Sequence, residues 1–236
     1  MTAGRTGGLH KLAPDLSVQD GDRIHFKTIP FDTRATLVRL PSGKLWLHSP
    51  VRPTDARIAQ IAAIGPVAHI IAPNPIHGAY TAAWQALFPS AQVWVSPKFV
   101  RRHPEIAPVN VLHDSPPDAW EEMLDQAVFR GNPILDEVEF YHRPSRTLIV
   151  TDILQRHDPT HDGWFWRMVK RVAGVLAPDG GLPLDLRWTT TGHAAARQSI
   201  ETVLGWDFDR VILAHDLIVE SGGKALLAQK FRWLMR

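Results

Sequence analysis

Three polar residues occupy positions suited to chemistry, because each stands just beyond a short apolar run that predicts a buried strand. The residues are His77, Asp152 and His215, and the runs that precede them are 67–72, 147–151 and 210–214. Loops beyond the carboxyl ends of strands converge in open α/β sheets, so the three side chains are expected to meet. Two imidazoles and one carboxylate are a workable ligand set for zinc, iron or manganese, and a metal held in this way can generate hydroxide near neutral pH. The alternative is that the three residues have structural roles. Two of the 12 histidines would then lie at strand ends by chance, and Asp152 would be a capping residue.

The hairpin expected around Ser145 decides which residues neighbour Asp152. With the turn centred there, His142 faces Thr147 and Asp152 lies opposite Glu137. At about 3.3 Å per residue, His142 is then at the far end of the hairpin and is not a ligand. Glu137 is a candidate extra ligand or orienting group. A charge at a strand edge in solvent is the alternative for Glu137.

The segment 157–162, His-Asp-Pro-Thr-His-Asp, has the composition of a metal site but contains a proline, which favours a solvated loop that at most rims a site. The surrounding stretch 155–187 is interpreted as an insertion or lid, with residues 164–166 as the part that covers the site. The helix that begins there is expected to present a solvated basic face, with an anchor for an anionic substrate as the less favoured alternative. Its basic residues are Arg167, Lys170 and Arg171.

Composition excludes several classes of protein. The 236 residues include no cysteine, which removes disulfides, thiolate zinc sites and cysteine nucleophiles. Lys and Arg number 26 against 24 Asp and Glu, so the chain lacks the electrostatic footprint of a nucleic-acid partner. No apolar run approaches the roughly 20 residues of a membrane span, and the start does not resemble a secretory signal. We therefore expect a cytoplasmic protein with a small-molecule substrate and no nucleic-acid or membrane partner.

Strand and helix patterns alternate along the chain, which predicts a single α/β domain over 1–236, a mixed sheet with helices packed outside. Residues 1–20 are Gly-rich and are expected to form a loose or edge-lying arm. The expected strands are 24–29, 35–40, 44–48, 67–72, 92–96, 127–130, 138–142, 147–151 and 210–214. The expected helices are 53–64, 79–88, 98–103, 164–175, 193–204 and a last one that begins at Ser221 or Gly222.

Several phrases of the sequence resemble a bacterial domain-of-unknown-function family (family 4336), a divergent relative of the metallo-β-lactamase superfamily. They are Leu-Trp-Leu-His-Ser-Pro at 45–50, Ala-Pro-Asn-Pro-Ile-His at 72–77, the stretch 140–152 and Val-Ile-Leu-Ala-His at 211–215. The resemblance covers roughly 36–215. It implies an αββα sandwich of two mixed sheets with outer helices.

The same resemblance implies which metal ligands survive. The superfamily places a His-x-His-x-Asp-His loop after a buried strand, and here Pro73 and Pro75 take the places of its first two histidines. His77 takes the place of the loop's Asp, and Gly78 stands where relatives in the family often carry a second His. Asp152 matches the later Asp and His215 the last His, whereas the His before the hairpin has no match, with Asn132 and Glu137 the nearest polar residues. One superfamily metal site is thus dismantled, and one metal at most is expected.

The leading hypothesis is a metal-dependent hydrolase in which metal-bound water attacks an ester, lactone or phosphoester. His77, Asp152 and His215 hold the metal, zinc first, with iron or manganese as alternatives. Asp152 also orients the attacking hydroxide, and Asn74 donates a hydrogen bond to substrate or to the metal-bound water. The alternative is a non-catalytic binding or scaffold protein of the same fold that has lost its metal. An oxidoreductase of the flavodiiron type needs two irons and more ligands than the chain offers.

Overall fold

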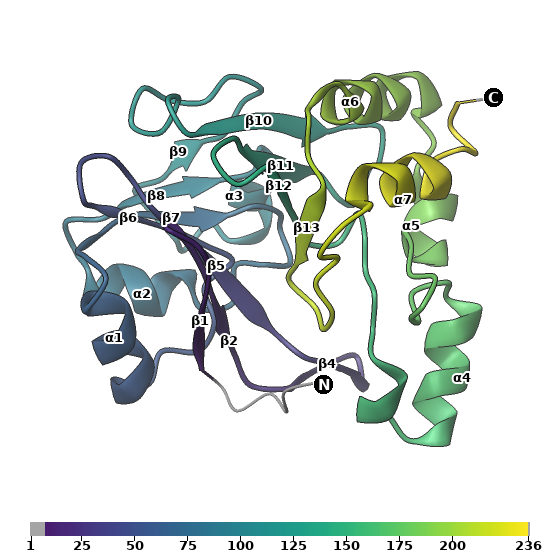
Figure 1. Cartoon of the computed structure of the whole chain (residues 1–236), viewed down its shortest axis with the longest axis horizontal. Helices are drawn as coiled ribbons and strands as arrows, with labels where there is room; N and C mark the ends of the chain where they lie inside the picture. The colour runs from purple at the N-terminus through teal and green to yellow at the C-terminus, as the bar shows by residue number, and fades with distance from the viewer. Residues whose placement is uncertain (1–7, 236) are drawn as a thin grey trace.

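Side chains alternate across the strands and sort the apolar residues into three buried clusters, which define the layers of the computed structural model (Figure 1). The structure describes residues 8–235. One cluster lies between two sheets and includes Trp46, Ile71, Phe140 and Ile149. The Trp46 and Phe140 rings meet edge to face with centroids 4.8 Å apart, so the two sheets share one dry interior.

The larger sheet runs, in spatial order, through seven strands of the described chain. They are β1 (Leu9–Ala13), β2 (Leu16–Asp20), β5 (Arg34–Arg39), β6 (Leu45–His48), β7 (Val67–Ala72), β8 (Gln92–Val95) and β9 (Asn110–Val111). Pairing is antiparallel from β1 to β6 and parallel from β6 to β9. The mixed sheet is thus confirmed.

The smaller sheet has the order β10 (Leu124–Phe129), β11 (Glu137–His142), β12 (Thr147–Val150) and β13 (Arg210–Leu213). Its last pair, β12 and β13, is parallel. The strands β3 (Ile24–Phe26) and β4 (Ile29–Phe31) form a separate hairpin, because the chain turns at 27–28 with positive φ at both residues. The single extended run expected over 24–29 is therefore two strands.

Helices cover the outer face of each sheet, which completes an αββα sandwich. The larger sheet is covered by α1 (Asp55–Ala62), α2 (Thr81–Leu87) and α3 (Phe99–Arg102), and the smaller one by α6 (His193–Gly205) and α7 (Gly223–Lys230). The connection between β12 and α6 carries the 3₁₀ turn η1 (Pro159–His161), α4 (Trp164–Val172) and α5 (Leu184–Thr189), with α4 and α5 along one edge of the molecule (Figure 1).

Local sequence explains where the elements begin and end. Helix α1 starts where the Thr54 side chain accepts a hydrogen bond from the Arg57 amide at 3.3 Å, and Gly65 with Pro66 prevents its continuation. Five of the six residues of β7 are apolar, and the strand is largely buried on both faces, as a parallel central strand requires. No helix of the described residues is long and apolar enough to cross a bilayer.

Of the loose or edge-lying arm expected over 1–20, the described part is not loose but lies at an edge of the larger sheet, where β1 is the edge strand. Residues 9–20 form β1 and β2, and Leu16 and Val18 alternate into the interior between the sheets. The alternation of apolar and polar residues in this stretch is short, and the glycines that precede it make the strand pattern hard to recognise in the sequence. Residues 1–7 lie outside the described residues.

A buried histidine of β7 makes the fold sensitive to acid. Burial and the nearby Lys44 cation lower the pKa of His69 to about 4, and Trp94 Nε1 donates a hydrogen bond to its Nδ1 at 3.2 Å. An unfolded histidine titrates near 6.5, so between about pH 6.5 and 4 the unfolded chain binds a proton that the folded protein does not. We expect this site to remove about 2 kcal/mol of stability as pH falls through that window, after allowance for solvent screening. In urea unfolding, His69→Gln should flatten the pH dependence, and the exposed-site control His113→Gln should not. Equal pH dependence in both variants would contradict the assignment.

Candidate metal centre

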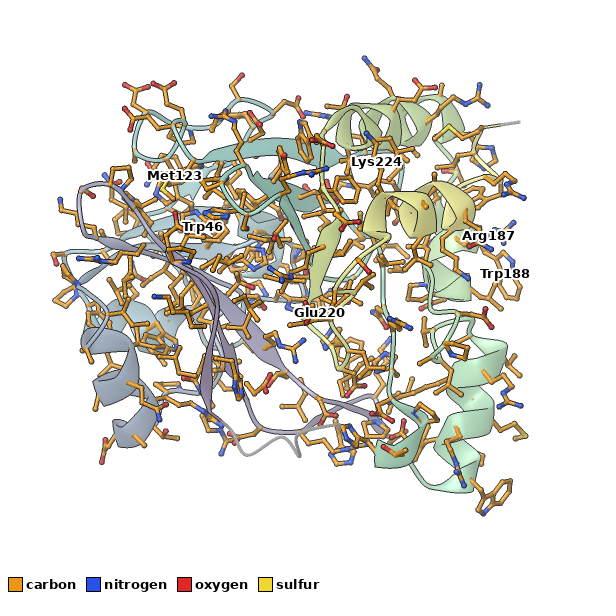
Figure 2. The ribbon with its side chains drawn as sticks, in the orientation of Figure 1. Trp46, Met123, Arg187, Trp188, Glu220 and Lys224 are labelled. Atoms are coloured by element: carbon orange, nitrogen blue, oxygen red, sulfur yellow. The ribbon has the colours of Figure 1, made fainter. Side chains whose placement is uncertain are left out.

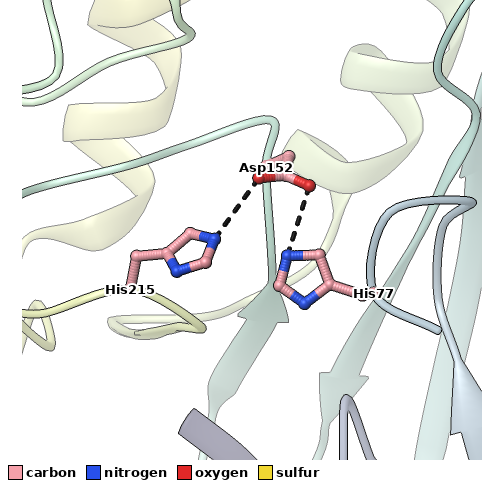
Figure 3. A group of neighbouring side chains, drawn as sticks. All are labelled: His77, Asp152 and His215. Carbon is pink, nitrogen blue, oxygen red and sulfur yellow. Dashed lines mark ion pairs between the residues drawn. The ribbon is translucent and has the colours of Figure 1, made fainter. Parts of the chain in front are cut away.

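Three strand ends bring His77, Asp152 and His215 together at one end of the interface between the sheets (Figure 3). His77 Nε2 lies 3.3 Å from Asp152 Oδ2, and His215 Nε2 lies 3.5 Å from Asp152 Oδ1. All three side chains are nearly buried. The structure therefore brings the three side chains together, as the strand ends predict.

These spacings suit a bound metal. Tetrahedral zinc with ligand bonds of about 2.0–2.2 Å separates its ligand atoms by about 3.3–3.6 Å. The two nitrogen–oxygen distances, 3.3 and 3.5 Å, fall in this range, and each nitrogen faces a different oxygen of Asp152. One ligand atom from each of the three residues lies within 4.8 Å of the others. The donor set of two nitrogens and one carboxylate fits a divalent metal.

The far nitrogens of both imidazoles are already engaged, which turns Nε2 toward the centre. His215 Nδ1 donates to the Asp32 carbonyl oxygen at 2.8 Å, so in the neutral ring Nε2 carries the free lone pair. His77 Nδ1 lies 2.7 Å from Ser49 Oγ. Ser49 has a φ of 50°, a conformation that is uncommon outside glycine. Hydrogen bonds of this kind fix ring orientation and tautomer in metal sites.

Asn74 positions the carboxylate and the loop that carries His77. Its Nδ2 lies 2.8 Å from Asp152 Oδ2, 2.8 Å from Thr151 Oγ1 and 3.0 Å from Glu137 Oε2, and its Oδ1 accepts hydrogen bonds from the amides of Ile76 and His77. The side chain is fully buried. The structure therefore shows Asn74 orienting Asp152 and the His77 loop, and the hydrogen bond to substrate or to metal-bound water suggested by the sequence stays a prediction.

Glu137 supports the same carboxylate from the neighbouring strand. Its Oε1 accepts the Thr151 amide at 2.6 Å, and its Oε2 accepts the Asp152 amide at 2.7 Å. It is fully buried, so a strand-edge charge in solvent is wrong. The expected register is confirmed, since His142 pairs with Thr147 at the other end of the hairpin.

The electrostatics of the centre keep Asp152 ionised. Burial alone would raise the pKa of Asp152, but the imidazoles of His77 and His215 hold it well below its usual value. Burial opposes protonation of His77, yet Asp152 and, less strongly, Glu137 outweigh it and raise the pKa of His77. Burial and the negative charge of Asp152 raise the pKa of Glu137. The centre thus presents an anionic ligand between two imidazoles.

Asn132, the other residue considered for the missing ligand, does not join the centre. Its Nδ2 donates to the Leu186 carbonyl at 2.9 Å and to Thr190 Oγ1 at 3.0 Å. It tethers the loop before β11 to α5.

The two ends of the segment 157–162 are packed inside the protein, whereas Thr160 and His161 between them are exposed. The solvated loop expected from the proline is therefore wrong for the ends of the segment and right for its middle. His157 is fully buried, with Nδ1 2.7 Å from Asp216 Oδ2 and Nε2 3.0 Å from Gln155 Oε1. Gln155 Nε2 in turn donates to Asp152 Oδ1 at 2.8 Å. The buried Asp162 carboxylate pairs with Lys170 at 2.7 Å, and it also pairs with Arg23. Charged partners from other parts of the chain compensate the buried charges.

A second group of potential ligands, Asp32, His161 and Asp216, forms an ion-pair network beside the centre. His161 Nδ1 lies 3.0 Å from Asp32 Oδ2 and 3.3 Å from Asp216 Oδ1, and Arg23 lies 3.7 Å from the same Asp32 oxygen. Because Asp32 directly follows β4, this network fastens the β3–β4 hairpin to the segment 157–162.

The hairpin, and not α4, covers the centre. The Phe31 ring packs against His215 and His157, with centroids 5.2 and 5.4 Å apart. Trp164, expected over the site, is 70 % exposed and lies on α4 at the outer edge (Figure 1). Sequence reasoning missed Phe31, Gln155 and Ser49. Ser49 alone had a signal, since it directly follows a predicted strand.

Gly78, at the position where the resemblance suggests a second histidine, has no room for a side chain. A Cβ there would lie 2.2 Å from Phe99 Cε2 and 2.6 Å from Phe99 Cζ. The buried Phe99 ring of α3 occupies that space.

Comparison with known proteins identifies the family of this chain. The family model described as "Domain of unknown function (DUF4336)" matches residues 24–160, more than half of the chain. The chain belongs to the DUF4336 family. The resemblance drawn from the sequence phrases is therefore confirmed. No curated protein matches this DUF4336 protein in sequence.

Solved structures identify the fold of this DUF4336 protein as that of the metallo-β-lactamases. A metallo-β-lactamase from Pontibacter korlensis superposes with a TM-score of 0.65 at 12% identity, covering 97% of this chain and 99% of that one. The metallo-β-lactamase FIM-1 from Pseudomonas aeruginosa in its mono-zinc form gives 0.64 at 9% identity, with 97% and 96% covered. A metal-soaked flavodiiron core from Synechocystis sp. PCC6803 gives 0.64 at 13% identity, with 97% of this chain and 60% of that one. The predicted αββα architecture is confirmed.

Proposed function

We propose that this DUF4336 protein is a hydrolase that holds one divalent metal, zinc in the first place, between His77, Asp152 and His215. The observation that carries the proposal is the convergence of two Nε2 atoms on one carboxylate at 3.3 and 3.5 Å. The hydrogen bond from His215 Nδ1 to the Asp32 carbonyl favours the tautomer in which Nε2 of His215 is a ligand, and the contact of His77 Nδ1 with Ser49 Oγ orients the His77 ring.

A divalent metal bound there would lower the pKa of a coordinated water and so provide hydroxide near neutral pH. The chain's own groups preorganise the site for that chemistry. Asp152 supplies negative charge, and the amides of Asn74 and Gln155, each 2.8 Å from one of its oxygens, prevent it from turning. Phe31 restricts water around the imidazoles, which strengthens the electrostatic interactions there.

The substrate class that fits is a small ester, lactone or phosphoester, whose hydrolysis needs an activated water and no further cofactor. The mono-zinc form of FIM-1 is a precedent for one zinc in this fold. The loop at 73–78 also favours a single metal site, because Pro73 and Pro75 lack ligating side chains and Gly78 has no side chain.

The test is metal content, measured by plasma mass spectrometry on untagged protein purified without chelator. We expect about one equivalent of zinc, or of iron or manganese, in the parent protein, lost in Asp152→Ala and in His215→Ala. The exposed residues His113 and Asp118 provide matched controls, and His113→Ala and Asp118→Ala should retain the metal. Circular dichroism checks that each variant is folded.

Loss of metal in folded variants would justify a screen of esters, lactones and phosphoesters, with Asp152→Ala as the inactive reference. No metal in the parent, even after reconstitution with each ion, would contradict the proposal. The non-catalytic binding or scaffold protein would then be the better description.

A further inference from the structure

Helix α4 has its apolar face turned outward. Trp164 and Val172 are each 70 % exposed, Met168 50 % and Phe165 47 %. At 100° per residue these four side chains span an arc of about 100° on one face of the helix. The one fully enclosed side chain of α4 is Lys170, which reaches inward to Asp162 at 2.7 Å and lies over the Phe31 ring. The usual arrangement of a surface helix is therefore reversed, and such faces mark interaction sites.

The charged side chains of α4 itself are all basic. Arg167 and Arg171 are both exposed and, by helical geometry, flank one edge of the apolar arc. Helix α4 contains no acidic residue. A hydrogen bond from the Leu184 amide to the Ala173 carbonyl joins the start of the next helix, α5, to the end of α4. Helix α5 adds an exposed Trp188, 76 % exposed, which projects outward with its neighbour Arg187 (Figure 2).

We infer that α4 docks this protein on the surface of an anionic phospholipid bilayer. Tryptophan and phenylalanine insert at the boundary between headgroups and acyl chains, and arginines beside them pair with lipid phosphates. The expectation of no membrane partner rested on the lack of a spanning run, which a helix lying in the interface does not need. The inference is independent of the proposed hydrolase activity.

A second copy of the chain fits the same face less well. Two such helices packed about a two-fold axis would bring their arginine rows close together without acidic partners on α4. A stable dimer also needs about 800 Å² from each partner, which four side chains of a helix of 9 residues do not supply.

The experiment is co-sedimentation of the full chain with vesicles of phosphatidylcholine alone or of phosphatidylcholine with phosphatidylglycerol. We expect binding to the anionic vesicles, and about a tenfold or greater loss of affinity in the double variant Trp164→Ser/Phe165→Ser. Arg167→Gln/Arg171→Gln should weaken binding and reduce its salt dependence. Leu87 on α2 and Val100 on α3 are exposed apolar residues elsewhere, so Leu87→Ser/Val100→Ser is the matched control and should bind as the parent does.

Three results would overturn the inference. One is no binding to anionic vesicles, and another is equal binding to neutral ones. The third is binding that survives Trp164→Ser/Phe165→Ser. Analytical ultracentrifugation of the same proteins tests the competing explanation, a dimer. If the parent is a dimer and Trp164→Ser/Phe165→Ser is a monomer, the face belongs to a second copy of the chain.

Discussion

Glu137→Ala should lower the free energy of unfolding by about 3–5 kcal/mol and abolish metal binding. The carboxylate accepts the amides of Thr151 and Asp152, at 2.6 and 2.7 Å, just beyond the end of β12. It also lies 3.0 Å from Asn74 Nδ2. Truncation leaves the amides of Thr151 and Asp152 without this acceptor, because water does not reach the site of a fully buried side chain. The chain segment that presents Asp152 then loses its anchor.

Two comparisons make this prediction specific. Glu137→Gln keeps the volume but points an NH₂ group at one of the donors, so we expect a smaller cost of about 2 kcal/mol. Glu105→Ala, at a largely exposed glutamate, should stay within about 0.5 kcal/mol of the parent. Urea unfolding supplies the energies, and plasma mass spectrometry supplies the metal content. A cost of Glu137→Ala below about 1 kcal/mol would contradict the role assigned to this carboxylate.

The positions of the three candidate ligands can be predicted because each depends on the end of a single strand. The apolar runs that precede His77, Asp152 and His215 are short and well delimited, with His69 as the one polar residue inside the first, so their ends, and hence the residues beyond them, can be recognised without tertiary information. The hairpin register also depends on local turn geometry, which is why Glu137 is found opposite Asp152.

Sequence reasoning fails where burial depends on partners distant in the chain. The segment 157–162 looks solvated because it is polar and contains proline, yet Asp162 is compensated by Lys170 and by Arg23 from the other end of the chain. Phe31 covers the centre only because the β3–β4 hairpin folds back over it. Pairings of this kind carry no periodic signal, so they cannot be predicted from one sequence.

The same contrast applies to α4. Its sequence has a strong helical pattern, and the natural assumption is that the apolar side of a helix faces the core. The structure has the reverse because Lys170 finds a buried carboxylate, and an ion pair at 2.7 Å determines which side faces inward. Tertiary charge pairing thus outweighs the apolar stripe at this position.

Gly78→Ala should destabilise the protein by about 3 kcal/mol, and Gly78→His by more. The new Cβ would lie 2.2 Å from Phe99 Cε2, and the Phe99 ring has little freedom to move, since it is fully buried and stacked on His103 with centroids 4.6 Å apart. Relief can come only from displacement of α3. Denaturant unfolding of each variant measures the cost.

Phe99→Leu tests whether that ring is the cause. The double variant Gly78→Ala/Phe99→Leu should cost about 1–2 kcal/mol less than the sum of the single variants, because the smaller side chain vacates the space. Gly205→Ala is the matched control, since no atom outside its own helix lies within 4 Å of its added Cβ, and alanine there should be neutral or stabilising. If Gly78→Ala instead costs less than about 0.5 kcal/mol, room for a side chain exists beside His77. The absence of a second histidine would then reflect the chemistry of the centre and not the packing of α3.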